Sequence, residues 1–181
     1  MEWFIPGTVL KADVASAVDQ QFSAMFLGGG IVLSQVTGIT GLEAYTVQNW
    51  VKRGFLSPPE RKHYSLEQLC RIININMLKN VLPMERIVGL LSYINGDLDD
   101  ESDDIIGDSQ LYFMFVRLAA QSRMMDTPQG RDECIAKELA DYREPVPGAK
   151  ERVEKVLTIM LTAWASAQLR QAAEQMLQEL N

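Results

Sequence analysis

Apolar residues recur at three- and four-residue steps along most of this chain, which is the spacing of one buried helix face. In residues 11–27 the apolar stripe is formed by Val14, Ala17, Val18, Phe22, Met25 and Phe26. In the helices expected near 66–80 and 84–95 it is formed by Leu69, Ile72, Ile73, Leu78, Ile87, Leu90, Leu91 and Ile94. No stretch shows sustained strand alternation. The pattern therefore predicts an all-α protein.

Two short helices are predicted in the middle of the chain, at 34–39 and about 43–53. Thr40-Gly41 interrupts the pattern between them, and Gly54 is placed where a helix ends in a left-handed residue. Ser57-Pro58-Pro59 can continue neither a helix nor a central strand, so residues 55–64 are predicted to form a tight loop or small hairpin.

Local signals mark the starts of the next two helices. Ser65 and Gln68 form a capping box, which predicts a helix from there to about Asn80. Pro83 is suited to the first turn of a further helix. Four helices and one loop then make a compact unit over 31–95.

Helices are also predicted at about 108–125, 128–142 and 148–180. Residues 97–108 hold seven acidic side chains, which favours a solvated interdomain loop. An EF-hand does not fit, because Ser102 and Asp108 occupy the loop positions that require glycine and glutamate. The apolar stripe of the last helix extends to Leu180, which suits either core packing or dimerisation.

Three regions follow from this pattern. Residues 1–30 form an N-terminal helix and a hinge at Gly28-Gly29-Gly30, and residues 31–95 form a DNA-binding domain by the argument below. Residues 96–181 comprise the acidic loop and a C-terminal helical bundle for dimerisation or effector binding.

The charge is unevenly distributed. The chain has a formal net charge of −7, which alone argues against a nucleic-acid partner, because Lys and Arg contacts to phosphate dominate affinity for DNA. Residues 31–95, however, hold seven Lys or Arg against four Asp or Glu, whereas residues 96–181 hold nine against seventeen. The positive charge is local to the middle of the chain.

Few residues are available for enzyme chemistry or metal binding. Cys70, Cys134 and His63 are the only cysteines and the only histidine, so no zinc site and no thiol–histidine pair can be assembled. We expect neither an enzyme nor a bound cofactor or metal. The first residues lack a positively charged leader and no apolar run suits a membrane span, so we expect a cytoplasmic protein without membrane contact.

An ordered set of motifs carries the functional prediction. Residues 40–56 read TGLEAYTVQNWVKRGFL, a Thr-Gly turn followed by twelve residues, a glycine and two apolar residues. Pro58-Pro59, Tyr64-Ser65 and Met84-Glu85-Arg86-Ile87 come next. This order resembles the winged helix-turn-helix of MerR-type transcriptional regulators over roughly Leu33 to Asn95. The helices around it resemble those that accompany MerR-like domains in uncharacterised bacterial proteins.

The resemblance and the amphipathic pattern of residues 43–53 together predict a DNA-binding face. Side chains on its outward side are expected to read bases, since Gln and Asn suit adenine and Thr suits the thymine methyl group. The residues expected to contact bases are Tyr45, Thr46, Gln48 and Asn49. Those expected to contact phosphates are Lys52, Arg53, Arg61, Lys62 and His63. Ala44, Val47, Trp50 and Val51 are expected to face the core.

We therefore expect a sequence-specific transcriptional regulator that binds double-stranded DNA as a homodimer. An unidentified small-molecule or protein effector is left open. The alternative is a protein-interaction module that keeps the helix-turn-helix without binding DNA. Glu43 at the start of the second helix and the acidic C-terminal region favour that alternative.

Overall fold

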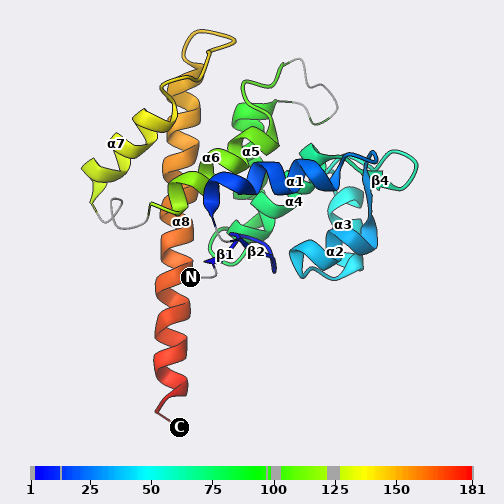
Figure 1. Ribbon diagram of the computed structural model, residues 1–181, viewed down its shortest axis with the longest axis horizontal. Coiled ribbons are helices and arrows are strands. Elements are labelled where there is room, and N and C mark those ends of the chain that lie inside the picture. Colours follow the sequence, from blue (N-terminus) through cyan, green and yellow to red (C-terminus); the bar gives the residue numbers. More distant parts are fainter. Residues whose placement is uncertain (1–2, 13, 97, 99–102, 122–126, 181) are drawn as a thin grey trace.

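The computed structural model describes residues 3–12, 14–96, 98, 103–121 and 127–180. Within these residues the protein is mainly helical, with eight α-helices and two small antiparallel sheets (Figure 1). The helices are α1 (Val18–Met25), α2 (Leu33–Thr40), α3 (Ala44–Lys52), α4 (Leu66–Leu78), α5 (Met84–Asn95), α6 (Asp108–Ala119), α7 (Pro128–Glu138) and α8 (Ala149–Gln178). None of the helices in this described part is long and apolar enough to cross a membrane.

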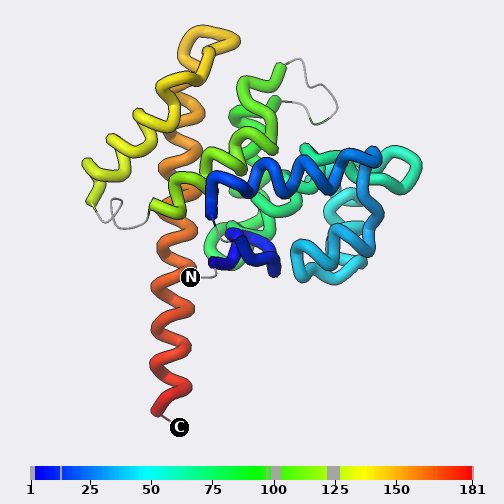
Figure 2. Tube along the Cα trace, viewed as in Figure 1, coloured from blue at the N-terminus to red at the C-terminus, as the bar shows by residue number. Residues whose placement is uncertain are grey.

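The N-terminal segment differs from the single long helix that the sequence predicts. Strands β1 (Trp3–Phe4) and β2 (Lys11–Ala12) pair as a small hairpin, and α1 begins only at Val18 after a short 3-10 turn. Val14 is exposed rather than part of a buried stripe, while Val18 and Phe22 are buried. Figure 2 shows this segment crossing the molecule beside the other helices.

Helices α2 and α3 form a compact unit with the second sheet. Residues 41–43 join the two helices, and Gly41 adopts the left-handed conformation with φ 69°. Strand β3 (Ile31–Val32), just before α2, pairs with β4 (His63–Tyr64), which comes after α3. The predicted small hairpin within residues 55–64 is confirmed by the bridge between Glu60 and His63.

Helix α4 is the centre of the hydrophobic core. Its predicted capping box is present: Gln68 N donates to Ser65 Oγ at 3.1 Å, and Ser65 N donates to Gln68 Oε1 at 2.9 Å. The helix packs against α2 and α5, and against α6 and α8 of the C-terminal half. One continuous cluster of buried apolar side chains runs through these elements.

Helix α6 ties the N-terminal segment and the end of the acidic segment to this core. Tyr112 is fully buried, and its hydroxyl donates to the Pro6 carbonyl at 2.9 Å, while Phe22 of α1 packs against Tyr112 and Phe113. Ile105 and Asp108, at the end of the acidic segment, are buried. That end is therefore anchored in the core rather than solvated, whereas residues 97 and 99–102 lie outside the described residues.

Helix α8 packs on the core only in its first half. Val153, Val156 and Met160 are buried, and Trp164 makes an edge-to-face contact with Phe115. Beyond this point the helix extends past the other elements (Figure 1). Core packing is therefore the wrong interpretation for the end of the helix, where the side chains of Leu169 and Met176 are exposed, as is that of Leu180 just beyond it.

Candidate nucleic-acid interface

Helix α3 presents a polar face to solvent. Val47 and Trp50 are buried beneath it, as the amphipathic pattern predicts. Of the four residues expected to contact bases, Tyr45 is 73% exposed, Gln48 and Asn49 are also exposed, and Thr46 is half-buried. Two of the four residues that were expected to face the core do not do so fully: Ala44 is exposed and Val51 is only half-buried. Both lie at the margin of the buried stripe.

The turn between α2 and α3 is fixed by backbone geometry. Gly41 has a positive φ, and a Cβ at this position would come within 2.9 Å of Val9 Cγ1. Thr40 Oγ1 accepts a hydrogen bond from Leu42 N at 3.3 Å and donates one to Val36 O at 2.8 Å. A glycine in a three-residue turn between two packed helices is typical of a helix-turn-helix.

Basic residues occupy the tip of a tight hairpin turn over residues 60–63. His63 N donates to Glu60 O at 2.8 Å, and Arg61 and Lys62 between them have φ values of 48° and 68°. These are the φ signs of a type I′ turn, which normally takes Asn, Asp or Gly. Both side chains and that of His63 are exposed. His63 Nδ1 lies 3.0 Å from Arg61 O.

The hairpin tip and α3 lie on either side of one groove. A hollow of about 560 Å³ between them is lined by Gln48 and Val51 of α3, by Lys62, and by Tyr64 of β4. One residue expected to contact bases and one expected to contact phosphate therefore line a single concave surface. Tyr64 is buried at this wall of the groove, and burial raises the pKa of its hydroxyl above the ordinary value.

The two basic residues at the end of α3 differ in their surroundings. Lys52 is exposed. Arg53 Nη2 lies 3.5 Å from Glu85 Oε1, and its guanidinium lies 4.4 Å from the centre of the Phe55 ring. Both partners of the ion pair are about half exposed or more, so solvent weakens it. Arg53 could exchange Glu85 for a phosphate at small cost.

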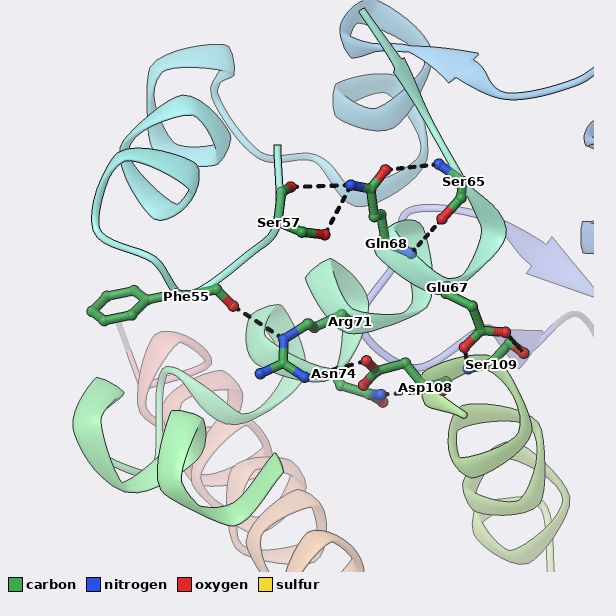
Figure 3. Close-up of polar contacts among 9 residues, drawn as sticks. All are labelled: Phe55, Ser57, Ser65, Glu67, Gln68, Arg71, Asn74, Asp108 and Ser109. Carbon is green, nitrogen blue, oxygen red and sulfur yellow. Dashed lines mark hydrogen bonds and ion pairs between the residues drawn. The ribbon is translucent and has the colours of Figure 1, made fainter. Parts of the chain in front are cut away.

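Polar contacts hold the loop that follows α3 against α4 (Figure 3). Gln68 Nε2 lies 3.0 Å from each of three oxygens of that loop, Ser57 O, Ser57 Oγ and Pro58 O, which share its two N–H groups. Arg71 Nε donates to Phe55 O at 3.0 Å. The capping box was predictable, but these contacts across the loop were not, because no local spacing signals them.

The same face of α4 holds the start of α6. Ser109 N donates to Glu67 Oε2 at 2.9 Å, and Ser109 Oγ donates to Glu67 Oε1. Arg71 Nη1 lies 3.3 Å from Asp108 Oδ2 in a buried ion pair. Burial raises the pKa of Asp108, although the Arg71 charge opposes this. The sequence did not single out these residues; their signal is the placement of Glu67, Arg71 and Asn74 within an apolar helix.

No cluster of metal-ligating side chains occurs in the described part of the chain. The geometry instead defines a largely helical protein with an exposed polar helix beside a basic hairpin tip. Residues 13–115 match the family model described as "Domain of unknown function (DUF1836)", and because this is more than half of the sequence, the chain belongs to that family.

A curated relative is "Uncharacterized protein YkrK" of Bacillus subtilis (strain 168), which is 28% identical over 106 residues. The similarity covers 56% of this chain and 46% of YkrK, so the chain spans about half the length of that relative. No solved structure matches. The resemblance to MerR-type regulators was wrong as a family assignment, because the matching model is DUF1836, a different family. A turn, a glycine and a proline-bearing loop are short motifs that do not fix a family.

Proposed function

We propose that this protein is a sequence-specific transcriptional regulator that binds double-stranded DNA through α2 and α3. The hairpin turn over residues 60–63 would act as a wing beside the recognition helix α3. One observation carries the proposal: Arg61 and Lys62 occupy left-handed backbone positions that are unfavourable for their side chains. Such strain is concentrated at functional sites, and here it projects two cations into solvent.

Helix α3 would enter the major groove. Gln48 and Asn49 are exposed and carry the paired donor and acceptor groups that suit adenine, and Tyr45 and Thr46 flank them. Each good bidentate contact contributes about 1–3 kcal/mol of discrimination between bases. The buried Val47 and Trp50 fix the helix on the core, so the polar face is presented on a rigid element.

The surrounding cations would hold the phosphate backbone. Arg61 and Lys62 would do so from the tip, with Lys52 and Arg53 from the end of α3 and His63 from β4. Of these cations, Lys62 also lines the groove beside Gln48. Glu43 and Glu60 are also exposed and would oppose phosphate, so they lower the affinity that the five cations provide.

The protruding part of α8 would pair two copies of the chain. Leu169 and Met176 are 74% and 66% exposed, and their seven-residue spacing places them on one helix face. Leu180, which is 81% exposed, follows just after the helix ends at Gln178. Burial of each such side chain contributes about 1.5–3 kcal/mol. Two copies would thus present two recognition helices, as paired half-sites require. Gln171 and Gln178 lie on the opposite face. Gln171→Glu with Gln178→Glu is therefore a charge-matched control for Leu169→Glu with Met176→Glu, which places the charges on the apolar face.

A salt titration of binding to mixed genomic DNA tests the proposal. Log affinity should decrease with log salt concentration by about 0.9 for each phosphate contact, and Lys52→Ala with Arg61→Ala should flatten that slope. Lys137→Ala with Lys155→Ala removes two exposed lysines of α7 and α8 and should leave it unchanged. Absence of salt-dependent binding by the wild type at low ionic strength would exclude DNA and favour the protein-interaction module.

A further inference from the structure

The groove between α3 and the hairpin tip has walls that differ in chemistry from the polar face of α3. Its volume of about 560 Å³ lies within the range of small-molecule sites. Half of the residues that line it are apolar: Val32 and Leu33, where β3 meets α2, Val51 of α3, and Pro59. Val32 is 37% exposed and the other three are half-buried. An apolar hollow of this size is typical of a site for an apolar ligand rather than for phosphate.

The walls of this groove are held in place by the fold itself. Ile31 and Tyr64 pair across β3 and β4, and the buried Val47 and Trp50 fix α3 on the core. Helix α2 contacts both α3 and β4, and the three elements lie together at the end of the molecule away from α8 (Figure 1). A site formed before its ligand arrives loses little conformational entropy on binding.

Lys62, Gln48, Ser34 and Tyr64 supply the polar groups of the groove. Among the described residues that line it, Lys62 is the only one with a charge at neutral pH, so the walls carry a net positive charge. Tyr64 is 3% exposed, its hydroxyl makes no hydrogen bond to any described residue, and solvent still reaches that oxygen. The ammonium, the amide and the two hydroxyls can all donate hydrogen bonds to a ligand.

These groups narrow the class of ligand. A cation would be repelled by Lys62. A neutral hydrocarbon would displace water from Lys62 and Tyr64 without replacing its hydrogen bonds, which is unfavourable. A small inorganic anion would leave the apolar walls in contact with water. A carboxylate with an apolar body satisfies both parts of the groove, because its oxygens accept charge-assisted hydrogen bonds while its body covers the apolar side chains.

We propose that the groove between α3 and the hairpin tip binds a small apolar carboxylate, such as a medium-chain fatty acid or an arylalkanoate. The apolar body covers Val32, Leu33 and Val51, and the carboxylate contacts Lys62. Gln48 and Lys62 line this groove and are also assigned to DNA contacts above, so the ligand and DNA compete for one surface and the ligand releases DNA. That last step rests on the proposed function, whereas ligand binding does not.

Calorimetric titration of the full chain, without DNA, tests the chemistry of the site. The probes are octanoate and phenylpropanoate, together with octanol, which lacks the charge, and acetate, which lacks the apolar body. We expect at least one of the two apolar carboxylates to bind, about tenfold or more tightly than octanol and acetate. Lys62→Gln should weaken that carboxylate about tenfold, since a charged hydrogen bond is lost, and should leave octanol unchanged. Lys137→Gln, which alters an exposed lysine of α7 outside the groove, should change neither.

A second pair of variants tests the place of binding. Val51→Glu puts a carboxylate into the groove and should abolish binding of the carboxylate probe. Ala44→Glu adds the same charge at an exposed position of α3 outside the groove and should leave binding unchanged. Should Val51→Glu fail to fold, the side-chain amide NMR signals of Gln48 in the wild type must shift on titration, and unshifted signals overturn the proposal.

The outcomes separate the site from its consequence. If neither carboxylate binds, if octanol or acetate binds equally well, or if Lys62→Gln or a folded Val51→Glu leaves binding unchanged, the proposed site is wrong. Binding of the carboxylate without any change in the affinity for DNA refutes the competition alone. If the protein binds no DNA, the proposed function fails, and the titrations without DNA still decide the site.

Discussion

Replacing the hairpin tip by Asn-Gly should stabilise the protein and weaken DNA binding at the same time. The left-handed conformation costs an ordinary residue about 1–2 kcal/mol, and Arg61 and Lys62 both adopt it. Asn tolerates this conformation and Gly is free in it, although Gly loses about 0.5–1 kcal/mol of chain entropy. For Arg61→Asn with Lys62→Gly we therefore expect a net gain of about 1–2 kcal/mol, or roughly 2–8 °C in Tm.

Thermal unfolding and a salt titration on the same variant measure the two effects. Loss of two phosphate contacts should flatten the plot of log affinity against log salt by about 1.8 per protomer. The control is Arg61→Gln with Lys62→Gln, which removes the charges but keeps side chains in the left-handed positions. It should flatten the plot equally without raising Tm. A lower Tm for the Asn-Gly variant would show that the tip is not strained, and an unchanged slope would show that it does not touch phosphate.

Gly41→Ala should lower the free energy of unfolding by about 1–2 kcal/mol, because φ is 69° at this position. Gly38→Ala, in open space within α2, should raise it by about 0.5–1 kcal/mol, and urea unfolding measures both changes. Asp108→Ala strands a buried arginine and should cost about 3–5 kcal/mol. Burial raises the pKa of Asp108, so its contribution to stability is complete below the unfolded pKa of about 4 and is lost as pH rises through the folded pKa. Urea unfolding midpoints should show this dependence on pH in the wild type and not in the Asp108→Ala variant. Leu169→Glu with Met176→Glu should leave Tm nearly unchanged and convert a dimer to a monomer in sedimentation, and an unchanged mass would refute pairing through α8.

The sequence predicted elements whose causes are local. The capping box at Ser65, the turn at Gly41 and the buried Val47 and Trp50 follow from spacings within a few residues, and all are present. The N-terminal region was predicted less well, because Lys11 and the residue after it pair with β1 instead of extending a helix. A two-residue strand leaves no periodic signal.

Contacts between distant residues could not be predicted in the same way. Arg71 and Asp108 are 37 positions apart, and neither is part of a recognisable motif. The acidic segment reads as solvated because its composition is polar, yet Asp108 is buried where α6 meets α4. A single sequence does not reveal such pairings. For that reason Gln48 and Lys62, which line the groove beside α3, were singled out from the sequence, whereas the buried pair of Arg71 and Asp108 was not.

The burial of helix α4 affects how the protein unfolds. Nine of its thirteen residues are buried, and its neighbours come from both halves of the chain. Its amide hydrogens should therefore be among the last to exchange with deuterium, and they should exchange only through opening of the whole fold. A fragment that ends at residue 95 would expose the side of α4 that α6 and α8 cover. We therefore expect that neither the part of the chain up to residue 95 nor the part after it folds on its own.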